Sequence, residues 1–286
     1  MPDFPISDTH VHLWDTNRFS YPWLSGQPKL NRPFLPDDYL AATGPLQVEN
    51  IVFVECGMAS GQSMEEASWV RDLAKTEPRI KAIIPSAPLE RGEESRAVLE
   101  AYRKYPLIKG VRRLIQTEAD PAFSIQPDFL RGVQMLAEYE FSFDICISDD
   151  QLKNTLKLVD QCPDTSFILD HIGKPDIKNR VTEPWKSELK ALSEFPNVTC
   201  KISGMITEAD HENWKKEELK PYIEHVIECF GFDRVLYGGD WPVVTLAGEY
   251  RQWVSALEWA LSGCRPEELK KLFCSNAVHV YKMSNE

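Results

Sequence analysis

The chain has 286 residues, of which 43% are hydrophobic and 27% are charged. This composition is that of a folded globular protein and excludes a disordered or collagen-like chain. The formal net charge of -12 repels polyanions and provides no basic stripe for a phosphate backbone, so we expect no nucleic-acid partner.

The cysteines and the N-terminus indicate the compartment. The seven cysteines are scattered and never form a Cys-x-x-Cys pair, so we predict reduced thiols. The first residues, Met-Pro-Asp-Phe-Pro, contain neither a basic n-region nor an apolar h-region, and no apolar run is long enough to cross a bilayer. We therefore expect a cytoplasmic protein without a membrane partner.

The stretch from residue 6 to residue 14, Ile-Ser-Asp-Thr-His-Val-His-Leu-Trp, is a predicted strand. Side chains alternate between the two faces of a strand, so His10 and His12 share a face and point the same way. Such a pair can begin a metal site or an acid–base cluster, but it is also compatible with a structural role.

A long segment at residues 15–38 follows, rich in aromatic residues and proline and without clear periodicity. Connections of this length are usually functional or disordered, and the aromatic content argues against disorder. Two interpretations stay open: a lid over a site, or a loop whose rings pack on the rim of the fold.

Short apolar runs then alternate with helical patterns along the rest of the chain. The predicted strands are residues 6–14, 50–56, 80–86, 107–112, 141–148, 165–171, 197–204 and 234–241. The predicted helices are residues 64–76, 93–105, 127–139, 151–161, 184–195 and 215–230, with two more in 247–281. Eight such units predict one α/β domain over residues 1–286, a (β/α)8 TIM barrel. The alternative is an open doubly wound sheet, but no Gly-x-Gly-x-x-Gly or Walker-type loop supports it.

Polar residues collect where these strands end, which is where barrels place active sites. They are His10, His12, Glu55, Arg112, Arg113, Asp170, His171, Lys201, Ser203, Asp240 and Trp241. A purely structural role would require each buried charge to have a partner within the protein. Strand parity places His171 and Asp170 on opposite faces, so we expect only one of them to face the mouth of the barrel.

Other patterns narrow the chemistry. His211, His225 and His279 fall in or beside predicted helices, where we expect solvated or packing roles. No Gly-x-Ser-x-Gly elbow is present, so a serine-hydrolase mechanism has no support. A non-covalent hydrolysis fits better, with Asp240 as general base for water and cationic groups polarising the electrophile.

Six motifs together resemble the amidohydrolase superfamily, and more narrowly the amidohydrolase-2 branch that includes fuconolactone and rhamnonolactone hydrolases. They are Asp-Thr-His-Val-His-Leu-Trp-Asp (8–15), Tyr-Pro-Trp-Leu (21–24), Gly-Val-Arg-Arg (110–113), Leu-Asp-His-Ile-Gly-Lys-Pro (169–175), Lys-Ile-Ser-Gly (201–204) and Gly-Gly-Asp-Trp-Pro (238–242). The His-x-His pair is shared by the whole superfamily, whereas the second and fourth motifs are more specific to the lactonases.

The resemblance implies a distorted (β/α)8 barrel that hydrolyses a small lactone. His10, His12, His171 and Asp240 match catalytic strand-end positions, with Asp240 deprotonating water. The implied substrate-binding residues are Arg112, Lys201, Glu55, Trp14, Trp23 and Trp241, the tryptophans forming walls against a sugar ring.

Two departures from the resembled pattern concern the general base and the metal. Gly239 stands before Asp240 where we expect Ser, so a hydrogen bond near the base is in doubt. Lys109 lies at the wrong end of its strand for a carbamylated bridge, which argues against a binuclear centre. His10, His12 and Asp240, with His171 as a fourth group, could hold one divalent ion such as zinc or manganese. The branch also resembles enzymes that work without metal, so both modes stay open.

The leading functional hypothesis is hydrolysis of a sugar-acid lactone, a small-molecule substrate. The alternatives are a metal-dependent decarboxylase of the same branch, and a non-catalytic barrel that binds a sugar acid or a protein partner. The sequence leaves the oligomeric state open.

Overall fold

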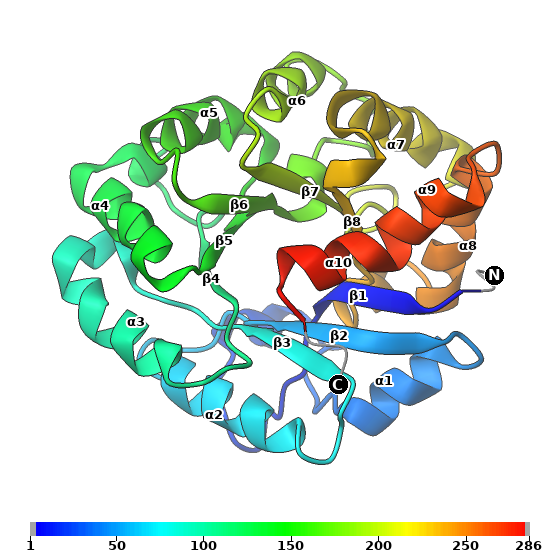
Figure 1. The fold of residues 1–286 in the computed structure, drawn as a ribbon. Coiled ribbons are helices and arrows are strands. Elements are labelled where there is room, and N and C mark those ends of the chain that lie inside the picture. Colours follow the sequence, from blue (N-terminus) through cyan, green and yellow to red (C-terminus); the bar gives the residue numbers. More distant parts are fainter. Residues whose placement is uncertain (1–3, 284–286) are drawn as a thin grey trace.

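The computed structural model describes residues 4–283 and shows helices surrounding a ring of parallel strands (Figure 1). The strands are β1 (Ile6–Val11), β2 (Val48–Val54), β3 (Ile80–Ile84), β4 (Gly110–Leu114), β5 (Ser142–Cys146), β6 (Ser166–Leu169), β7 (Val198–Ile202) and β8 (Val235–Tyr237). The helices are α1 (Pro36–Thr43), α2 (Ser63–Leu73), α3 (Arg96–Arg103), α4 (Pro127–Met135), α5 (Leu152–Gln161), α6 (Trp185–Ser193), α7 (Lys216–Phe230), α8 (Tyr250–Ala260), α9 (Pro266–Lys270) and α10 (Asn276–Val280). The predicted alternation of parallel strands with helices is confirmed.

The strands form two parallel ladders that follow the order of the chain. One contains β1, β2 and β3, and the other contains β4 to β8. Isolated bridges connect them, from Ile83 to Ile108 and from Ser86 to Arg112 on one side, and from Val11 to Trp241 on the other. The C-terminal ends of the strands therefore lie at one end of the ring, where parallel strands present the residues that follow them.

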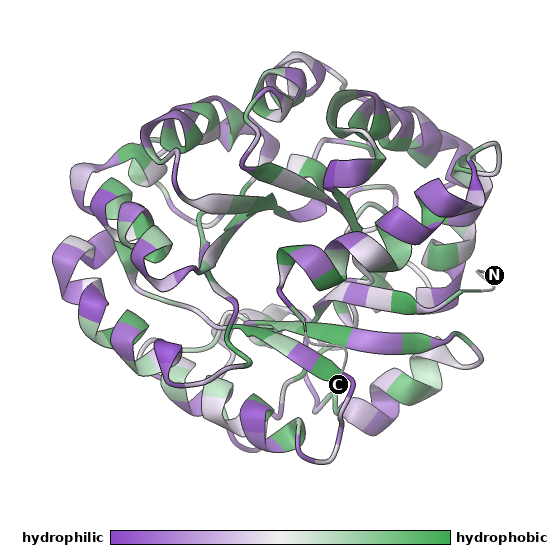
Figure 2. Ribbon diagram, in the orientation of Figure 1, coloured by the Kyte–Doolittle hydropathy of each residue, from purple (hydrophilic) through white to green (hydrophobic). Residues whose placement is uncertain are grey.

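The helices of the outer ring alternate hydrophobic and hydrophilic residues along their length (Figure 2), so each can bury one face against the strands. Inside the ring, one buried cluster contains side chains of β2, β3, β6 and β8 together with Ala277, Tyr281 and Met283. The C-terminal segment therefore packs into the interior of the ring. None of the helices within residues 4–283 is long and apolar enough to cross a membrane.

The aromatic segment packs closely on the rest of the fold. Tyr21, Leu24, Leu30 and Phe34 are buried, and Phe34 pairs with Trp14 in an antiparallel bridge. This order agrees with the aromatic content of the segment, but α1 begins at Pro36, inside the range expected to lack periodic structure. Proline at the first turn of a helix needs no backbone hydrogen bond, which makes it a suitable first residue.

Candidate active site

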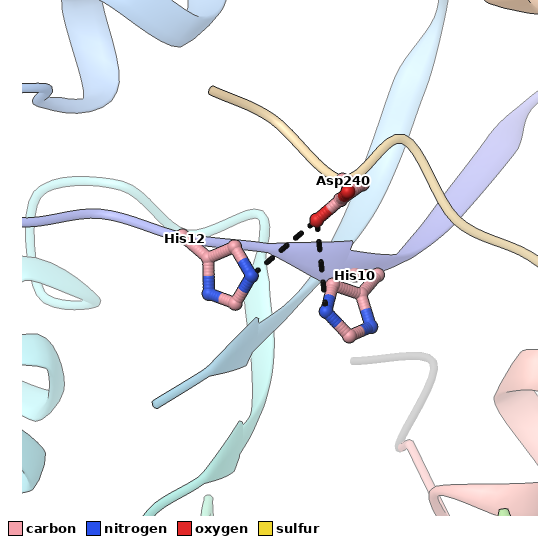
Figure 3. A group of neighbouring side chains, drawn as sticks. All are labelled: His10, His12 and Asp240. Carbon is pink, nitrogen blue, oxygen red and sulfur yellow. Dashed lines mark ion pairs between the residues drawn. The ribbon is translucent and has the colours of Figure 1, made fainter. Parts of the chain in front are cut away.

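His10 and His12 lie side by side and both approach Asp240 (Figure 3). Their Nε2 atoms lie 3.9 Å and 3.5 Å from Asp240 Oδ1, respectively. His10 is fully buried within β1, His12 directly follows that strand, and Asp240 follows β8. The convergence of the two imidazoles on one point, expected from strand alternation, is what the structure shows.

A hydrogen bond at Nδ1 of His12 determines whether its Nε2 carries a proton or a lone pair. Nδ1 lies 2.9 Å from the carbonyl oxygen of Val54, which can only accept, so Nδ1 carries the proton. In the neutral ring, Nε2 then directs a lone pair at the Asp240 carboxylate. Two acceptors 3.5 Å apart need a proton or a cation between them.

The donor set fits one divalent ion. One ligand atom from each of His10, His12 and Asp240 lies within 4.8 Å of the others, and the same holds for His10, Asp170 and His171. A backbone carbonyl that fixes the tautomer of a histidine is the usual arrangement behind a metal ligand. The balance of buried charge around the site also favours a bound cation. Among the described residues, four buried carboxylates lie near only two buried cations: Glu55, Asp144, Asp170 and Asp240, with Arg112 and Lys201.

Asp240 is fixed through its backbone. Its φ angle is 53°, its amide donates to the carbonyl of His10 over 2.8 Å, and its own carbonyl accepts from the amide of Val244. Asp8 lies behind it and accepts hydrogen bonds from the Gly239 amide at 2.7 Å and from the hydroxyls of Tyr39 and Tyr250. The position of the carboxylate is therefore set by β1 as much as by β8.

Gly239, where serine was expected, has no room for a side chain. A Cβ atom there would lie 2.3 Å from the Tyr250 ring and 2.4 Å from Asp8 Oδ2. The backbone amide of Gly239 donates a hydrogen bond to Asp8 Oδ1 over 2.7 Å.

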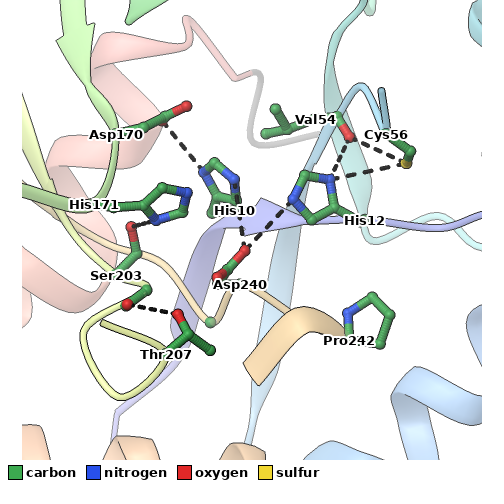
Figure 4. Close-up of polar contacts among 12 residues, drawn as sticks. His10, His12, Val54, Cys56, Asp170, His171, Ser203, Thr207, Asp240 and Pro242 are labelled. Atoms are coloured by element: carbon green, nitrogen blue, oxygen red, sulfur yellow. Dashed lines mark hydrogen bonds and ion pairs between the residues drawn. The ribbon is translucent and has the colours of Figure 1, made fainter. Parts of the chain in front are cut away.

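Asp170 and His171 both contact His10 (Figure 4), but only His171 lines the cavity, in agreement with the prediction that one of the two faces the mouth of the barrel. Asp170 Oδ1 lies 3.3 Å from His10 Nδ1, and the His171 ring centroid lies 4.4 Å from that of His10. Strand alternation is not the reason, because β6 ends at Leu169 and His171 adopts a left-handed conformation with φ of 54°. His171 Nδ1 contacts Ser203 Oγ at 2.9 Å, and the lack of a side chain at Gly204 makes room for the ring.

Arg112 is held by carboxylates on two sides. Its Nε donates to Glu55 Oε1 over 2.8 Å, and its Nη1 lies 3.2 Å from Asp170 Oδ2 and 3.3 Å from His10 Nε2. The guanidinium is 4% exposed, and its pKa remains above its usual range because the attraction of Glu55 and Asp170 outweighs burial. Arg112 thus presents a fixed positive charge beside the histidines.

Burial and charge set the protonation of this cluster. Burial lowers the pKa of His10 well below its usual value and that of His171 to about 4, so both rings are neutral near pH 7. Burial opposes ionisation of Asp240, but the adjacent histidines lower its pKa below the usual range. The protonation of Asp240 is therefore coupled to that of the histidines around it, and the guanidinium of Arg112 is a fixed charge beside them.

A cavity of about 930 Å³ opens above this cluster. Of the predicted site residues, His12, Trp23, Glu55, Arg112, His171 and Asp240 line it. His10 lies directly behind them. The direct substrate contact expected of Lys201, Trp14 and Trp241 is corrected, since they are 0%, 0% and 2% exposed and absent from the cavity wall. Trp14 instead packs edge-on against Trp23.

Sequence reasoning missed four residues around the site. Asp144, in the middle of β5, makes an ion pair with Lys201, and Asp8 supports Asp240, but neither stands at a strand end. Lys174 and His211 line the cavity, and His211 is exposed there, which agrees with a solvated position but not with a role outside the site. Lys174 belongs to the Asp-His-Ile-Gly-Lys-Pro motif, which was the available signal.

Comparisons with known proteins agree with this site. Residues 7–283 match the amidohydrolase family. An L-fucono-1,5-lactonase of Burkholderia multivorans is 30% identical over 96% of this chain and 95% of its own length. An L-rhamnono-gamma-lactonase of Scheffersomyces stipitis is 26% identical over 99% of this chain and all of its own. The crystal structure of a Burkholderia multivorans amidohydrolase with bound zinc has a TM-score of 0.89 and 27% identity, covering 98% of this chain and 100% of its own. The chain therefore belongs to the amidohydrolase family of hydrolases.

Proposed function

We propose that this protein hydrolyses a small, uncharged sugar-acid lactone to the free acid within a distorted (β/α)8 barrel. The observation that carries the proposal is the position of the Asp240 carboxylate, which lines the cavity beside His12, His171 and Arg112. Two relatives over nearly the whole chain are named as sugar-acid lactonases, which supports the same class of substrate.

The charges of the cavity favour an uncharged ring over an anionic one. Arg112 is paired with Glu55 and Asp170. Arg113 is paired with Glu90 and Glu118, and Lys174 lies 3.6 Å from Glu208. A substrate carboxylate bound to Arg112, Arg113 or Lys174 would have to displace one of these protein carboxylates, whereas hydroxyl groups can bind between them without separating charges. Among the described residues, Arg91 is the cavity-lining arginine without a carboxylate partner.

In the proposed reaction, Asp240 accepts a proton from water as the water oxygen attacks the lactone carbonyl. Arg112 stabilises the negative charge that develops on the carbonyl oxygen. The bond between the carbonyl carbon and the ring oxygen then breaks, and the ring oxygen takes the proton held on Asp240, which leaves a hydroxy acid. His171 and His12 orient the substrate and the base, Glu55 fixes Arg112, and Trp23 provides an apolar wall.

His10, His12 and Asp240, with His171 as a fourth group, would hold a divalent ion. When bound, such an ion would act as a Lewis acid on the lactone carbonyl.

The test is a panel of 1,4- and 1,5-aldonolactones with the purified protein, followed by acid release. Each lactone is assayed with the protein as purified, after chelation, and after zinc or manganese is restored. We expect turnover of at least one uncharged lactone and much slower turnover of a lactone that carries extra carboxylates. The proposal is wrong if none of the uncharged lactones is hydrolysed faster than in buffer.

A further inference from the structure

A chain of buried polar groups runs through the interior of the ring behind the active site. The hydroxyl of Tyr281 donates to Asp144 Oδ2 over 3.2 Å. The same carboxylate oxygen lies 2.6 Å from Lys201 Nζ, and Lys201 Nζ lies 3.0 Å from Asp170 Oδ1. Tyr281 is 1% exposed and the other three are fully buried.

This series of buried polar groups ends at Arg112 and His10 of the active site. Asp170 lies between these two residues: its Oδ2 lies 3.2 Å from Arg112 Nη1, and its Oδ1 lies 3.3 Å from His10 Nδ1. Lys201 Nζ also lies 3.3 Å from His10 Nδ1. Any displacement of Lys201 therefore changes the surroundings of Asp170 and His10 together.

These residues are too deeply placed to touch a substrate. Asp144, Lys201 and Tyr281 do not line the cavity, and Tyr281 enters the ring from the C-terminal segment. A buried ion pair adds little net stability compared with an apolar pair of the same volume. Stability alone therefore gives no reason for a Lys–Asp pair at this position, whereas fixing the geometry of Asp170 does.

We propose that Asp144, Lys201 and Tyr281 are positioning residues, which hold Asp170 between Arg112 and His10 and so orient both groups for catalysis. Lys201 supplies the charge that both carboxylates share, Asp144 sets where the ammonium group lies, and Tyr281 fixes Asp144. The kinetic consequences rest on the proposed lactone hydrolysis, but the effect on His10 does not.

The first test is Tyr281→Phe, which removes one hydroxyl and keeps the packing of the ring. We expect kcat to fall about three- to tenfold with KM unchanged, because the reacting groups lose alignment while the cavity wall stays intact. The ¹⁵N shifts of the His10 imidazole should also change, although Tyr281 does not contact His10. Their assignment comes from the signals lost in His10→Asn.

The second test is the charge-neutral double variant Asp144→Leu/Lys201→Met, compared with Lys201→Met alone. The single variant leaves Asp144 and Asp170 without their shared cation and should be strongly destabilised. The double variant should recover most of the lost Tm, yet keep kcat about a hundredfold below the wild type. A matched control is Asp233→Leu/Lys271→Met, which removes an exposed ion pair and should leave kcat unchanged.

The outcomes separate this inference from the proposed function. Wild-type kcat in the double variant, or Tyr281→Phe with unchanged kcat and unchanged His10 shifts, would overturn the positioning role. If the double variant does not fold, Tyr281→Phe decides. If the wild type hydrolyses no lactone, the proposed function fails, and the His10 shifts in Tyr281→Phe alone decide the inference.

Discussion

Asp240 combines the position and the charge that a general base requires. It is ionised, lines the cavity and adopts a left-handed backbone conformation with φ of 53°. Asparagine tolerates this conformation better than most residues, so Asp240→Asn should fold normally. We expect kcat/KM for the best lactone to fall by about 10²- to 10⁴-fold, the usual range for loss of a general base. The measurement is acid release together with Tm, and activity within threefold of the wild type would contradict the role.

His12 allows a test of the metal site that does not depend on activity. With Nδ1 bonded to the Val54 carbonyl, Nε2 is free to bind an ion beside Asp240. Zinc at about 100 times its Kd should stabilise the folded protein by about 2.7 kcal/mol. We expect zinc to raise the Tm by several degrees, chelator to reverse the shift, and His12→Phe to abolish it. His279→Gln, at an exposed position, should respond like the wild type.

For single residues, the expectation that active sites lie at strand ends identified side chains that the structure brings together. It could not describe how these side chains interact. His10, His12, Arg112 and Asp240 were found because they stand at or near strand ends. Asp144 was missed because it lies within a strand, where an acidic residue has no periodic signal. Lys201 was assigned to the substrate because its ion pairs with Asp144 and Asp170 depend on strands far apart in the sequence.

Among the elements, most strands and helices lie within a few residues of their predicted positions, because hydrophobic periodicity reports directly on burial. The aromatic segment was the exception. Its order comes from tertiary contacts, such as the hydrogen bond from the Trp23 indole to the Cys56 carbonyl, that local sequence cannot show. The left-handed turn after β6 was missed for a similar reason, since His171 and Ile172 are not residues that usually adopt positive φ.

The contact between the aromatic segment and α2 leads to a prediction of how the free energy of unfolding depends on pH. Glu66 of α2 is fully buried, accepts a hydrogen bond from the Tyr21 hydroxyl, and has a pKa raised well above 4.5 by burial. Between pH 4.5 and that raised pKa, the folded state binds more protons than the unfolded state, so stability falls as pH rises. Glu66→Gln removes this loss because the amide does not ionise.

We therefore expect the free energy of unfolding of Glu66→Gln, relative to the wild type, to increase from acidic to alkaline pH. Urea denaturation of both proteins at several pH values measures the difference. Glu65→Gln is the matched control, because Glu65 is the neighbouring residue of the same helix and is exposed. A difference for Glu66→Gln that is constant with pH would contradict the buried, protonated state of this side chain.

On the scale of the whole molecule, the ring depends on contacts that connect distant parts of the chain. Isolated bridges and side-chain contacts join the two ladders, such as the hydrogen bond from the Thr9 hydroxyl to the Tyr237 carbonyl. The chain's last described helix and the residues after it pack inside the ring. The alternation of strands and helices predicted the ring, but no sequence pattern indicated that its interior is filled by residues from the C-terminal segment. The residues that fill the ring therefore stabilise the fold and also contact the polar groups behind the active site, as Tyr281 contacts Asp144.

Tyr281 tests that connection, since its side chain is 1% exposed and lies in the same cluster as Val52, Ile84 and Leu236. Tyr281→Ala removes a buried ring and leaves a cavity, which for large aromatic side chains costs about 3–5 kcal/mol. At roughly 2–4 °C for each kcal/mol, the Tm should fall by at least 6 °C. Tyr281→Phe keeps the ring and should lose only about 1 kcal/mol for its hydrogen bond. Thermal unfolding of the two variants separates packing from hydrogen bonding, and equal Tm values for both would show that the ring does not stabilise the interior.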